Sequence, residues 1–176
     1  MSIFRLKKEV NIIVYESENS IHWNFKGELE VKNIDNDFGY MWECPDYINI
    51  DGKDVLIFSP QGVNPKGFDY NNIYNVVYAI GNMNLDNLVF EIDTIKEFEK
   101  GFDFYAPQTF KKDSQIILLA WAGMGEVSYP TDENKWAHCL TVPRRLSIKN
   151  NKLLQMPVDE LSKLRFDEKN NQNTSR

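Results

Sequence analysis

Short apolar runs separated by polar turn segments occupy nearly the whole chain. Many of them are rich in β-branched and aromatic residues, which favour strands. Pairs of runs flank turn signals. Asp51-Gly52 is a dipeptide that strongly favours a two-residue hairpin turn, and Asn150-Asn151 is the expected turn between the last two runs. The expected strands are NIIVYE (11–16), IHWNFKG (21–27), YINI (47–50), DVLIFSP (54–60), YNVVYAIG (74–81), NLVFEI (87–92), QIILLAW (115–121) and, between 138 and 155, HCLTV, LSIK and KLLQ.

One segment has the periodicity of a helix. In PVDELSKLR (157–165), Val158, Leu161 and Leu164 fall on one face, and Pro157 suits a first helical position. The pattern therefore predicts an all-β chain of antiparallel meanders with a short C-terminal helix. Because no clean repeat period is visible, the pattern does not choose among a sandwich, a barrel and a propeller.

The ends of the chain carry two further expectations. The first hairpin has no preceding partner strand, and a hairpin alone is marginal in water, so the chain is expected to begin in the middle of a larger fold. The segment 167–176, DEKNNQNTSR, is polar and predicts a frayed tail.

Composition narrows the classes of function. The 176 residues suffice for one domain, and a net charge of -6 argues against binding to nucleic acid or to an anionic membrane. No apolar run approaches the roughly 20 residues of a membrane span, and the N-terminus lacks the apolar core of a secretory leader, so a cytoplasmic location is expected. Two cysteines and two histidines without a CxxC pair predict neither a disulfide framework nor a metal or other cofactor.

Four segments, in order, resemble glycoside hydrolase family 32, the invertase and β-fructosidase group, and most closely its bacterial sucrose-6-phosphate hydrolases. The likeness spans about residues 10 to 165. The segments are IVYESENSIHWNFKGEL, GYMWECPDYINIDGKDVLIFSPQG with the family's Glu-Cys-Pro-Asp signature, GFDFYAPQTF, and ILLAWAGMGEVSYPTDENKWAHCLTVPRRLSIKNNKLLQMPVDEL.

The resemblance implies a five-bladed β-propeller with a central active-site funnel. Residues 1–166 would form the C-terminal portion of that propeller, and 167–176 the polar tail. The family's nucleophile is the aspartate of an Asn-Asp-Pro-Asn-Gly motif, and its transition-state stabiliser is the aspartate of an Arg-Asp-Pro motif. Neither motif occurs here, and Asn36-Asp37 is followed by Phe38, so it is not a substitute.

The resemblance assigns Glu43 the role of acid/base. A retaining glycosidase needs two carboxyl groups roughly 5–5.5 Å apart, one attacking the sugar and one protonating the leaving oxygen. The apolar neighbours Trp42, Cys44 and Pro45 would favour the protonated form by desolvation. The alternative is a surface glutamate at the start of a strand.

Four more residues resemble members of the sugar pocket. Asp46 would support the substrate or the acid/base, or would instead act as a local cap or turn residue. Asp103 and Tyr105 would line the pocket, the alternative being core packing. Trp121 would wall the funnel, although the segment Ala-Trp-Ala-Gly-Met (120–124) departs from the family's usual Gly-Trp-Met-Gly.

Other candidates are given structural roles. Cys44 has no cationic neighbour in sequence, so a packing role is expected rather than that of a nucleophile. His138 is expected to be a structural histidine. Arg144-Arg145 could hold a phosphate group, but the resemblance favours a structural role there.

Three functions follow as hypotheses. The chain would act as a β-fructofuranosidase on sucrose, sucrose 6-phosphate or another β-fructoside. It would instead be a fragment of such an enzyme that is inactive alone and self-associates or joins a complementing polypeptide with the early blades. The third hypothesis is a non-catalytic carbohydrate-binding or assembly protein derived from half a propeller.

Overall fold

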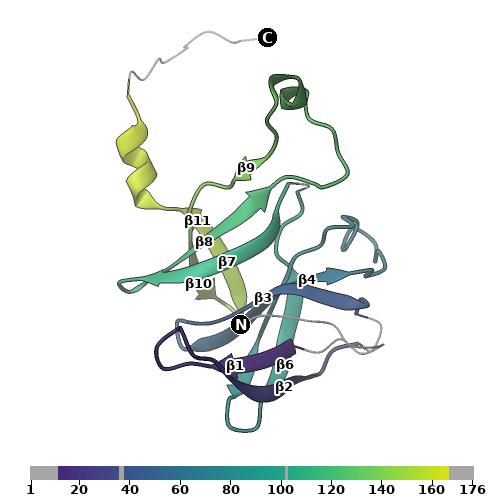
Figure 1. Ribbon diagram of the computed structural model, residues 1–176, viewed down its shortest axis with the longest axis vertical. Helices are drawn as coiled ribbons and strands as arrows, with labels where there is room; N and C mark the ends of the chain where they lie inside the picture. The colour runs from purple at the N-terminus through teal and green to yellow at the C-terminus, as the bar shows by residue number, and fades with distance from the viewer. Residues whose placement is uncertain (1–11, 36–37, 102, 167–176) are drawn as a thin grey trace.

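The computed structural model describes residues 12–35, 38–101 and 103–166 (Figure 1). The expected polar tail at 167–176 lies outside the described residues. The elements are β1 (Ile12–Glu16), β2 (Asn24–Lys32), β3 (Met41–Ile50), β4 (Lys53–Gln61), β5 (Val77–Asn84), β6 (Val89–Glu97), β7 (Tyr105–Lys112), β8 (Gln115–Ala122), the 3-10 helix η1 (Pro130–Asn134), β9 (Cys139–Leu140), β10 (Arg144–Lys149), β11 (Lys152–Pro157) and the 3-10 helix η2 (Asp159–Leu164).

The strands form two sheets, which confirms the all-β prediction. The first sheet has the order β1-β2-β6-β5-β4-β3, and the second has the order β11-β10-β8-β7 with β9 beside β8. Strands β3 to β6 form one antiparallel meander, as expected. The pair β2–β6 is parallel, which the meander pattern does not predict. It places the β1–β2 hairpin along β6, where it covers an edge that would otherwise be open.

The predicted turns are confirmed at two hairpins. Asp51 and Gly52 have φ values of 53° and 77°, and Asn150 and Asn151 have 53° and 55°. Positive φ at both central residues is the requirement of the turn that best matches strand twist. The expected strand at 47–50 was too short, because β3 begins at Met41 and so includes the Trp-Glu-Cys-Pro-Asp run.

The predicted helix is present but is a 3-10 helix with different bounds. Pro157 ends β11, so its assignment to the first helical position was wrong. No residue of η2 is buried, and Leu164 is 69% exposed. Val158 and Leu161 are half-buried, so the apolar face predicted at Val158, Leu161 and Leu164 is packed only in part.

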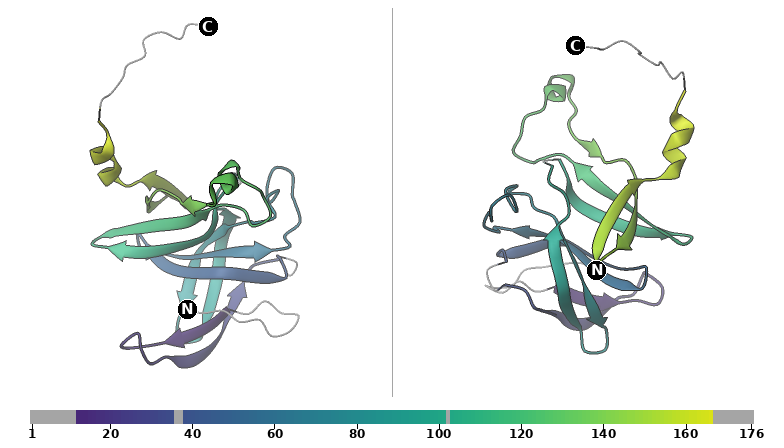
Figure 2. Two further views of the ribbon diagram at one scale, coloured as in Figure 1. Left: turned by 45° about the horizontal axis from the view of Figure 1, so that its top comes forward. Right: turned by 180° about the vertical axis from the view of Figure 1, so that it is seen from behind.

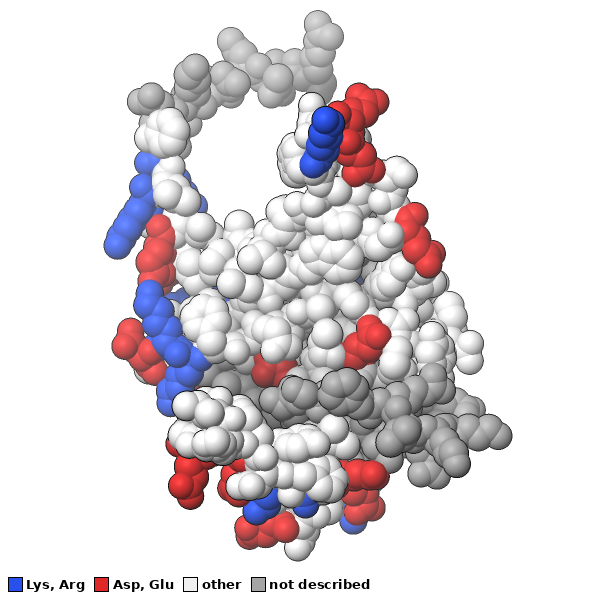
Figure 3. Space-filling model, in the orientation of Figure 1, with Lys and Arg blue, Asp and Glu red and all other residues white. Residues whose placement is uncertain are grey.

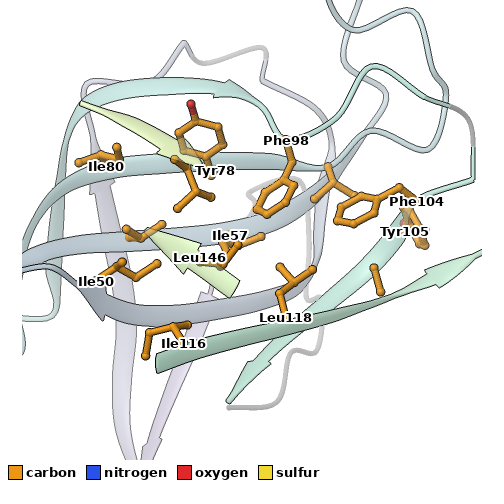
Figure 4. Close-up of a cluster of buried hydrophobic side chains, with 14 residues drawn as sticks. Ile50, Ile57, Tyr78, Ile80, Phe98, Phe104, Tyr105, Ile116, Leu118 and Leu146 are labelled. Carbon is orange, nitrogen blue, oxygen red and sulfur yellow. The ribbon is translucent and has the colours of Figure 1, made fainter. Parts of the chain in front are cut away.

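The two sheets lie one above the other and enclose a shared core (Figure 2). We call it the inter-sheet core; Figure 4 shows its side chains converging from both sheets. A second core lies on the opposite face of the first sheet, where Trp42, Phe58 and Phe90 pack with residues of the β1–β2 hairpin. The buried residues of the inter-sheet core are Ile50, Val55, Ile57, Val76, Tyr78, Ile80, Phe98, Phe104, Tyr105, Ile116, Leu118, Ala120, Leu146 and Leu153.

The two sheets begin as copies of one backbone unit. Cys44 in β3 and Ala106 in β7 have φ values of 50° and 48°, and each precedes a proline. The hairpin turns that follow carry Asp51 and Asp113, with φ values of 53° and 56°. Both pairs have the separation of 62 residues that also relates Glu43 to Tyr105. A repeat therefore exists, and neighbouring blade-like units agree with the propeller expectation; the number of five blades stays a prediction.

The surface carries mixed charges. On the face shown in Figure 3, acidic and basic side chains are interspersed around the margin, and the central area is largely uncharged. Among the described residues, no helix has the length and apolar character needed to cross a membrane. The expectations of no nucleic-acid or membrane partner stay predictions.

Polar side chains tie the two sheets together. The Asp51 carboxylate in the β3–β4 turn accepts a hydrogen bond from the amide of Ile148 in β10, at 2.9 Å. Arg144 donates to Glu99 and to Gln155, each at 2.7 Å, and its guanidinium lies 5.0 Å from the centre of the Phe104 ring. Arg144 is thus fully engaged in joining β10 to the segment between β6 and β7.

We predict that Arg144→Met lowers the free energy of unfolding by about 2 kcal/mol, because a partly buried Glu99 loses a charge-assisted hydrogen bond. Arg145→Met is the matched control. Its partner Asp159 is 79% exposed at 3.3 Å, so a change below about 0.5 kcal/mol is expected. Urea unfolding measures both variants, and equal losses would contradict the assignment of Arg144 as a tie between the sheets.

Candidate active site

A β-bulge at Cys44-Pro45 determines where the carboxylates of β3 point. Glu43 pairs with Ser59 of β4 and Asp46 pairs with Ile57, so one extra residue lies in β3 between the two pairs. Successive side chains of a strand point to opposite faces, and one extra residue shifts this alternation by one. Glu43 and Asp46 therefore project from the same face of the sheet, although their spacing of three would normally separate them.

The packing of the neighbouring residues agrees with this shift. Before the bulge, Trp42 packs in the second core; after it, Tyr47 packs against the same core. Ile48 and Ile50 contribute to the inter-sheet core. The face with Glu43 is thus the face that looks toward the second sheet.

Cys44 adopts a conformation that is unfavourable for its type and position. Its φ of 50° is uncommon for a residue with a Cβ, and the following proline restricts it further. Burial raises the pKa of the Cys44 thiol, and the charge of Glu43 adds to the effect. A raised pKa keeps the thiol protonated at neutral pH, the opposite of what a nucleophilic cysteine requires.

Glu43 is half-buried and receives two hydrogen bonds on one oxygen. The Tyr105 hydroxyl donates to Oε2 at 2.5 Å, and the Gln61 side-chain amide donates to the same atom at 3.3 Å. The Gln61 amide also donates to the Tyr105 hydroxyl at 2.5 Å. The three side chains come from β3, β4 and β7, so both sheets build the site.

Burial and the bond to Glu43 raise the pKa of the Tyr105 phenol well above its usual range. The phenol therefore stays a hydrogen-bond donor over the whole physiological pH range. Gln61 has no signal of its own in the sequence beyond its place in the Ser-Pro-Gln-Gly run that ends β4. A tight turn after a strand that pairs with β3 is the feature that could have drawn attention to it.

A cluster of aromatic rings extends from Tyr105. Its ring centre lies 5.5 Å from that of Tyr74 and 6.3 Å from that of Trp121, its partner across β7 and β8. His138 lies between Trp121 and Tyr129, with ring centres 4.8 Å and 4.9 Å away. Trp121 thus belongs to a wall of rings next to Tyr105, and His138 is packed within that wall.

Asp46 and Asp103 make no hydrogen bond to Glu43, Tyr105 or Gln61 among the described residues; each is bonded elsewhere. Asp46 accepts a hydrogen bond from the amide of Thr109 in β7 at 2.6 Å, and burial raises the pKa of this carboxyl although the bond opposes the rise. Asp103 is exposed and accepts a bond from the Tyr129 hydroxyl at 2.8 Å. Asp46 therefore links β3 to β7, while Asp103 anchors the loop that follows β8.

The described residues offer no arrangement for a metal ion: across 12–35, 38–101 and 103–166, no three His, Cys, Asp or Glu side chains form a suitable group. Both cysteines are free thiols. The chemistry available at the site is that of a carboxyl group held by two uncharged donors beside aromatic rings.

The chain resembles known proteins in both sequence and structure. Residues 3–157 match the family described as the glycosyl hydrolases family 32 N-terminal domain. The sucrose-6-phosphate hydrolase of Staphylococcus xylosus is 46% identical over 164 residues, covering 93% of this chain and 33% of that protein. The corresponding protein of Bacillus subtilis is 40% identical, covering 89% and 34%.

Solved structures agree. A GH32 β-fructofuranosidase of Bombyx mori superposes with a TM-score of 0.80 at 35% identity, over 89% of this chain and 34% of that one. A sucrose-6-phosphate hydrolase of Lactobacillus gasseri gives 0.77 at 37% identity, over 89% and 33%. The chain thus spans about a third of the length of the relatives it matches.

We predict that Glu43→Gln lowers the pKa of the Tyr105 phenol, because a neutral amide replaces the charged acceptor of its hydrogen bond. Titration of Tyr side chains labelled at the ring carbon that bears the hydroxyl would follow this by NMR. Tyr47 is the internal control. Burial and a 2.9 Å bond to Asp54 raise its pKa to about 12, and this value should not move.

The same substitution has a consequence for stability. Because folding raises the pKa of Tyr105, the native state holds the phenolic proton more tightly than the unfolded chain does. The free energy of unfolding should therefore fall as the pH rises above about 10, and fall less in Glu43→Gln. An unchanged Tyr105 titration in the variant would show that the two side chains are not bonded in solution.

Proposed function

The chain belongs to glycosyl hydrolase family 32, and from this premise we propose that it supplies the acid/base half of a retaining β-fructofuranosidase. The observation that carries the proposal is the β-bulge that holds Glu43 between the two sheets, with Oε2 bonded to Tyr105 and Gln61. No hydrogen bond from the described residues reaches the other oxygen, Oε1. That oxygen is free to exchange a proton with a substrate.

The proposed chemistry has two steps. In the first, Glu43 donates its proton to the glycosidic oxygen of a β-fructoside while a carboxylate nucleophile attacks the anomeric carbon of the fructosyl group. The bond between that carbon and the glycosidic oxygen breaks, the remainder of the substrate leaves as an alcohol, and a fructosyl ester remains. In the second, the Glu43 carboxylate accepts a proton from a water molecule that attacks the fructosyl ester, which releases fructose and the nucleophile. The hydrogen bonds from Tyr105 and Gln61 fix the orientation of the carboxyl plane in both steps.

The nucleophile is proposed to come from polypeptide outside these 176 residues. The sequence contains no Asn-Asp-Pro-Asn-Gly segment, and the nearest carboxylate in the Glu-Cys-Pro-Asp run, Asp46, is occupied by the amide of Thr109. Covalent catalysis is lost when its nucleophile is missing. The chain alone is therefore proposed to be inactive.

The proposed substrates are sucrose, sucrose 6-phosphate or another β-fructoside. The relatives in Staphylococcus xylosus and Bacillus subtilis are sucrose-6-phosphate hydrolases, and the structure of a fructan 1-exohydrolase of Cichorium intybus has been solved in complex with 1-kestose. Tyr105 and Trp121 would offer ring surface to the sugar. Asp46 and Asp103 would support the pocket through their bonds to Thr109 and Tyr129. A cytoplasmic location stays a prediction.

A complementing polypeptide or a second copy is proposed to cover the free face of the second sheet. The strand registers place Phe110, Arg145 and Met156 on the face that points away from the inter-sheet core. Phe110 is 47% exposed and Met156 is 58% exposed. An apolar sheet face normally packs on a further layer of structure.

We predict that the chain alone hydrolyses neither sucrose nor sucrose 6-phosphate. Hydrolysis should arise when it is mixed with a polypeptide that carries the preceding region of a family member, including Asn-Asp-Pro-Asn-Gly. In that mixture, Glu43→Gln should lower kcat by roughly 10²–10⁴-fold. Glu18→Gln is the control, because Glu18 is an exposed residue of the β1–β2 turn. Fructose release measures the activity. Robust hydrolysis by the chain alone would contradict the proposal that the nucleophile comes from another polypeptide.

We also predict that the isolated chain self-associates, and that the complementing polypeptide converts it into a heteromeric complex. Phe110→Ser combined with Met156→Ser should weaken both forms of association, because it removes exposed apolar surface. Lys152→Ser, at the other end of the strand that carries Met156, is the control. Size-exclusion chromatography with light scattering provides the masses. A stable monomer in all of these conditions would argue against a covered sheet face.

A further inference from the structure

A separate cleft lies on the other side of the first sheet from Glu43. Its volume is about 430 Å³, within the range of small-ligand sites. It is formed by the β2–β3 connection, the β4–β5 connection and β6. Its apolar wall, which includes Ile34, Phe38 and Tyr70, packs against the second core, whereas Glu43 faces the inter-sheet core. The cleft is therefore distinct from the candidate active site.

We propose that this cleft binds one sugar ring of a neutral oligosaccharide. The first support is its combination of aromatic and polar lining. The rings of Phe38 and Tyr70 meet edge to face, with centres 5.6 Å apart and planes at 90°. Ring surfaces in a cleft can pack on the C–H faces of a sugar, and such sites add a few polar groups to fix orientation.

The polar groups of the cleft suit hydroxyl groups rather than a charged ligand. Its lining includes a carboxylate on Asp35, an amide on Asn64 and an ammonium on Lys66. Within the described residues, these three side chains make no hydrogen bond or ion pair with one another or with other side chains. One positive and one negative group cancel in net charge, and together the three offer both donors and acceptors. A polyhydroxylated neutral ligand matches that set.

Tyr70 is held in place by its surroundings. Its φ of 59° is uncommon for a bulky residue, and such conformations persist where neighbouring contacts enforce them, often at ligand sites. The Tyr70 amide donates to Glu97 at 2.9 Å, and Glu97 also accepts a bond from Lys100 at 2.5 Å. Preorganisation of this kind reduces the entropy that binding would otherwise cost.

The preceding turn is equally constrained. Lys66 and Asp69 exchange two backbone hydrogen bonds, at 2.9 Å and 3.0 Å. The Asn71 side chain donates to the carbonyl of Gly67 at 3.1 Å and to that of Asp69 at 3.2 Å. The segment that presents Lys66 and Tyr70 to the cleft therefore has a defined shape before any ligand arrives.

The cleft is also joined to the strand that carries Glu43. The indole N–H of Trp42 donates to the carbonyl of Phe38 at 2.7 Å. A β-fructoside held here by one ring would remain close to that strand, which raises its effective concentration there. The binding itself does not depend on hydrolysis or on a complementing polypeptide.

Titration of the full chain with 1-kestose, followed by ¹H–¹⁵N NMR, tests the proposal. We expect saturable shifts in the Asn64 side-chain amide and in the backbone amides of Lys66 to Tyr70. Asn64→Ala and Lys66→Met alter exposed side chains, so the fold should persist. Each should weaken binding about fivefold, the equivalent of one hydrogen bond. Lys152→Met is the matched control, and neither it nor Glu43→Gln should change the affinity.

Three results would overturn the proposal. The first is the absence of saturable shifts at the cleft. The second is binding that Glu43→Gln weakens while Asn64→Ala and Lys66→Met leave it unchanged, since this places the sugar at the candidate active site. The third is binding of sucrose 6-phosphate but not of 1-kestose, lost in Lys66→Met, since this identifies an anion site. Because the readout is binding to the chain alone, it is independent of whether the mixture hydrolyses a β-fructoside.

Discussion

The alternation of side chains along β3 is the constraint on which the rest of the site depends. Ile48 and Ile50 must enter the inter-sheet core, and Trp42 must enter the second core on the opposite face. In a regular strand these residues, an even number apart, would share one face. The bulge at Cys44-Pro45 resolves the conflict with one extra residue, and it simultaneously turns Glu43 toward the second sheet. The cost is that Cys44, which is not a glycine, has a positive φ in front of a proline. The pairing of β3 with β4 before and after the bulge holds this conformation in place.

A β-bulge in the second sheet positions Tyr105, the hydrogen-bond partner of Glu43, in the same way. Tyr105 pairs with Trp121 and Gln108 pairs with Leu119, so β7 also contains one extra residue, next to Ala106 at a φ of 48°. Because the two bulges occupy equivalent places in repeated units, the first residue of each meets the other across the interface. The bond between Tyr105 and Glu43 is therefore a consequence of the repeat, and the inter-sheet core and the bonds to Thr109 and Ile148 maintain it.

The hydrophobic periodicity of the sequence predicts the strands in which apolar and polar residues alternate, but not the segments in which this alternation is broken. The turns at Asp51-Gly52 and Asn150-Asn151 were predictable because positive φ limits the residue types that fit. The bulged start of β3 was not, because a bulge disrupts the alternation by which a strand is detected. The 62-residue repeat was hidden for a related reason: backbone conformation is shared at Cys44 and Ala106, whereas the side chains differ. Resemblance supplied Glu43 and Tyr105, but Gln61 emerged only from the three-dimensional arrangement, since it acts through contacts with β3 and β7.

The environment of Glu43 bears on which part of the proposed reaction this chain can supply. Tyr105 and Gln61 both donate hydrogen bonds to Oε2, so one oxygen of the carboxyl group is held in a fixed position. Under the proposed function, the same group gives a proton to the leaving oxygen in the first step and takes one from water in the second, so a fixed orientation serves both steps. The chain would therefore supply a positioned acid/base, and the proposed partner polypeptide would supply the carboxylate that a retaining mechanism places roughly 5–5.5 Å away to attack the sugar.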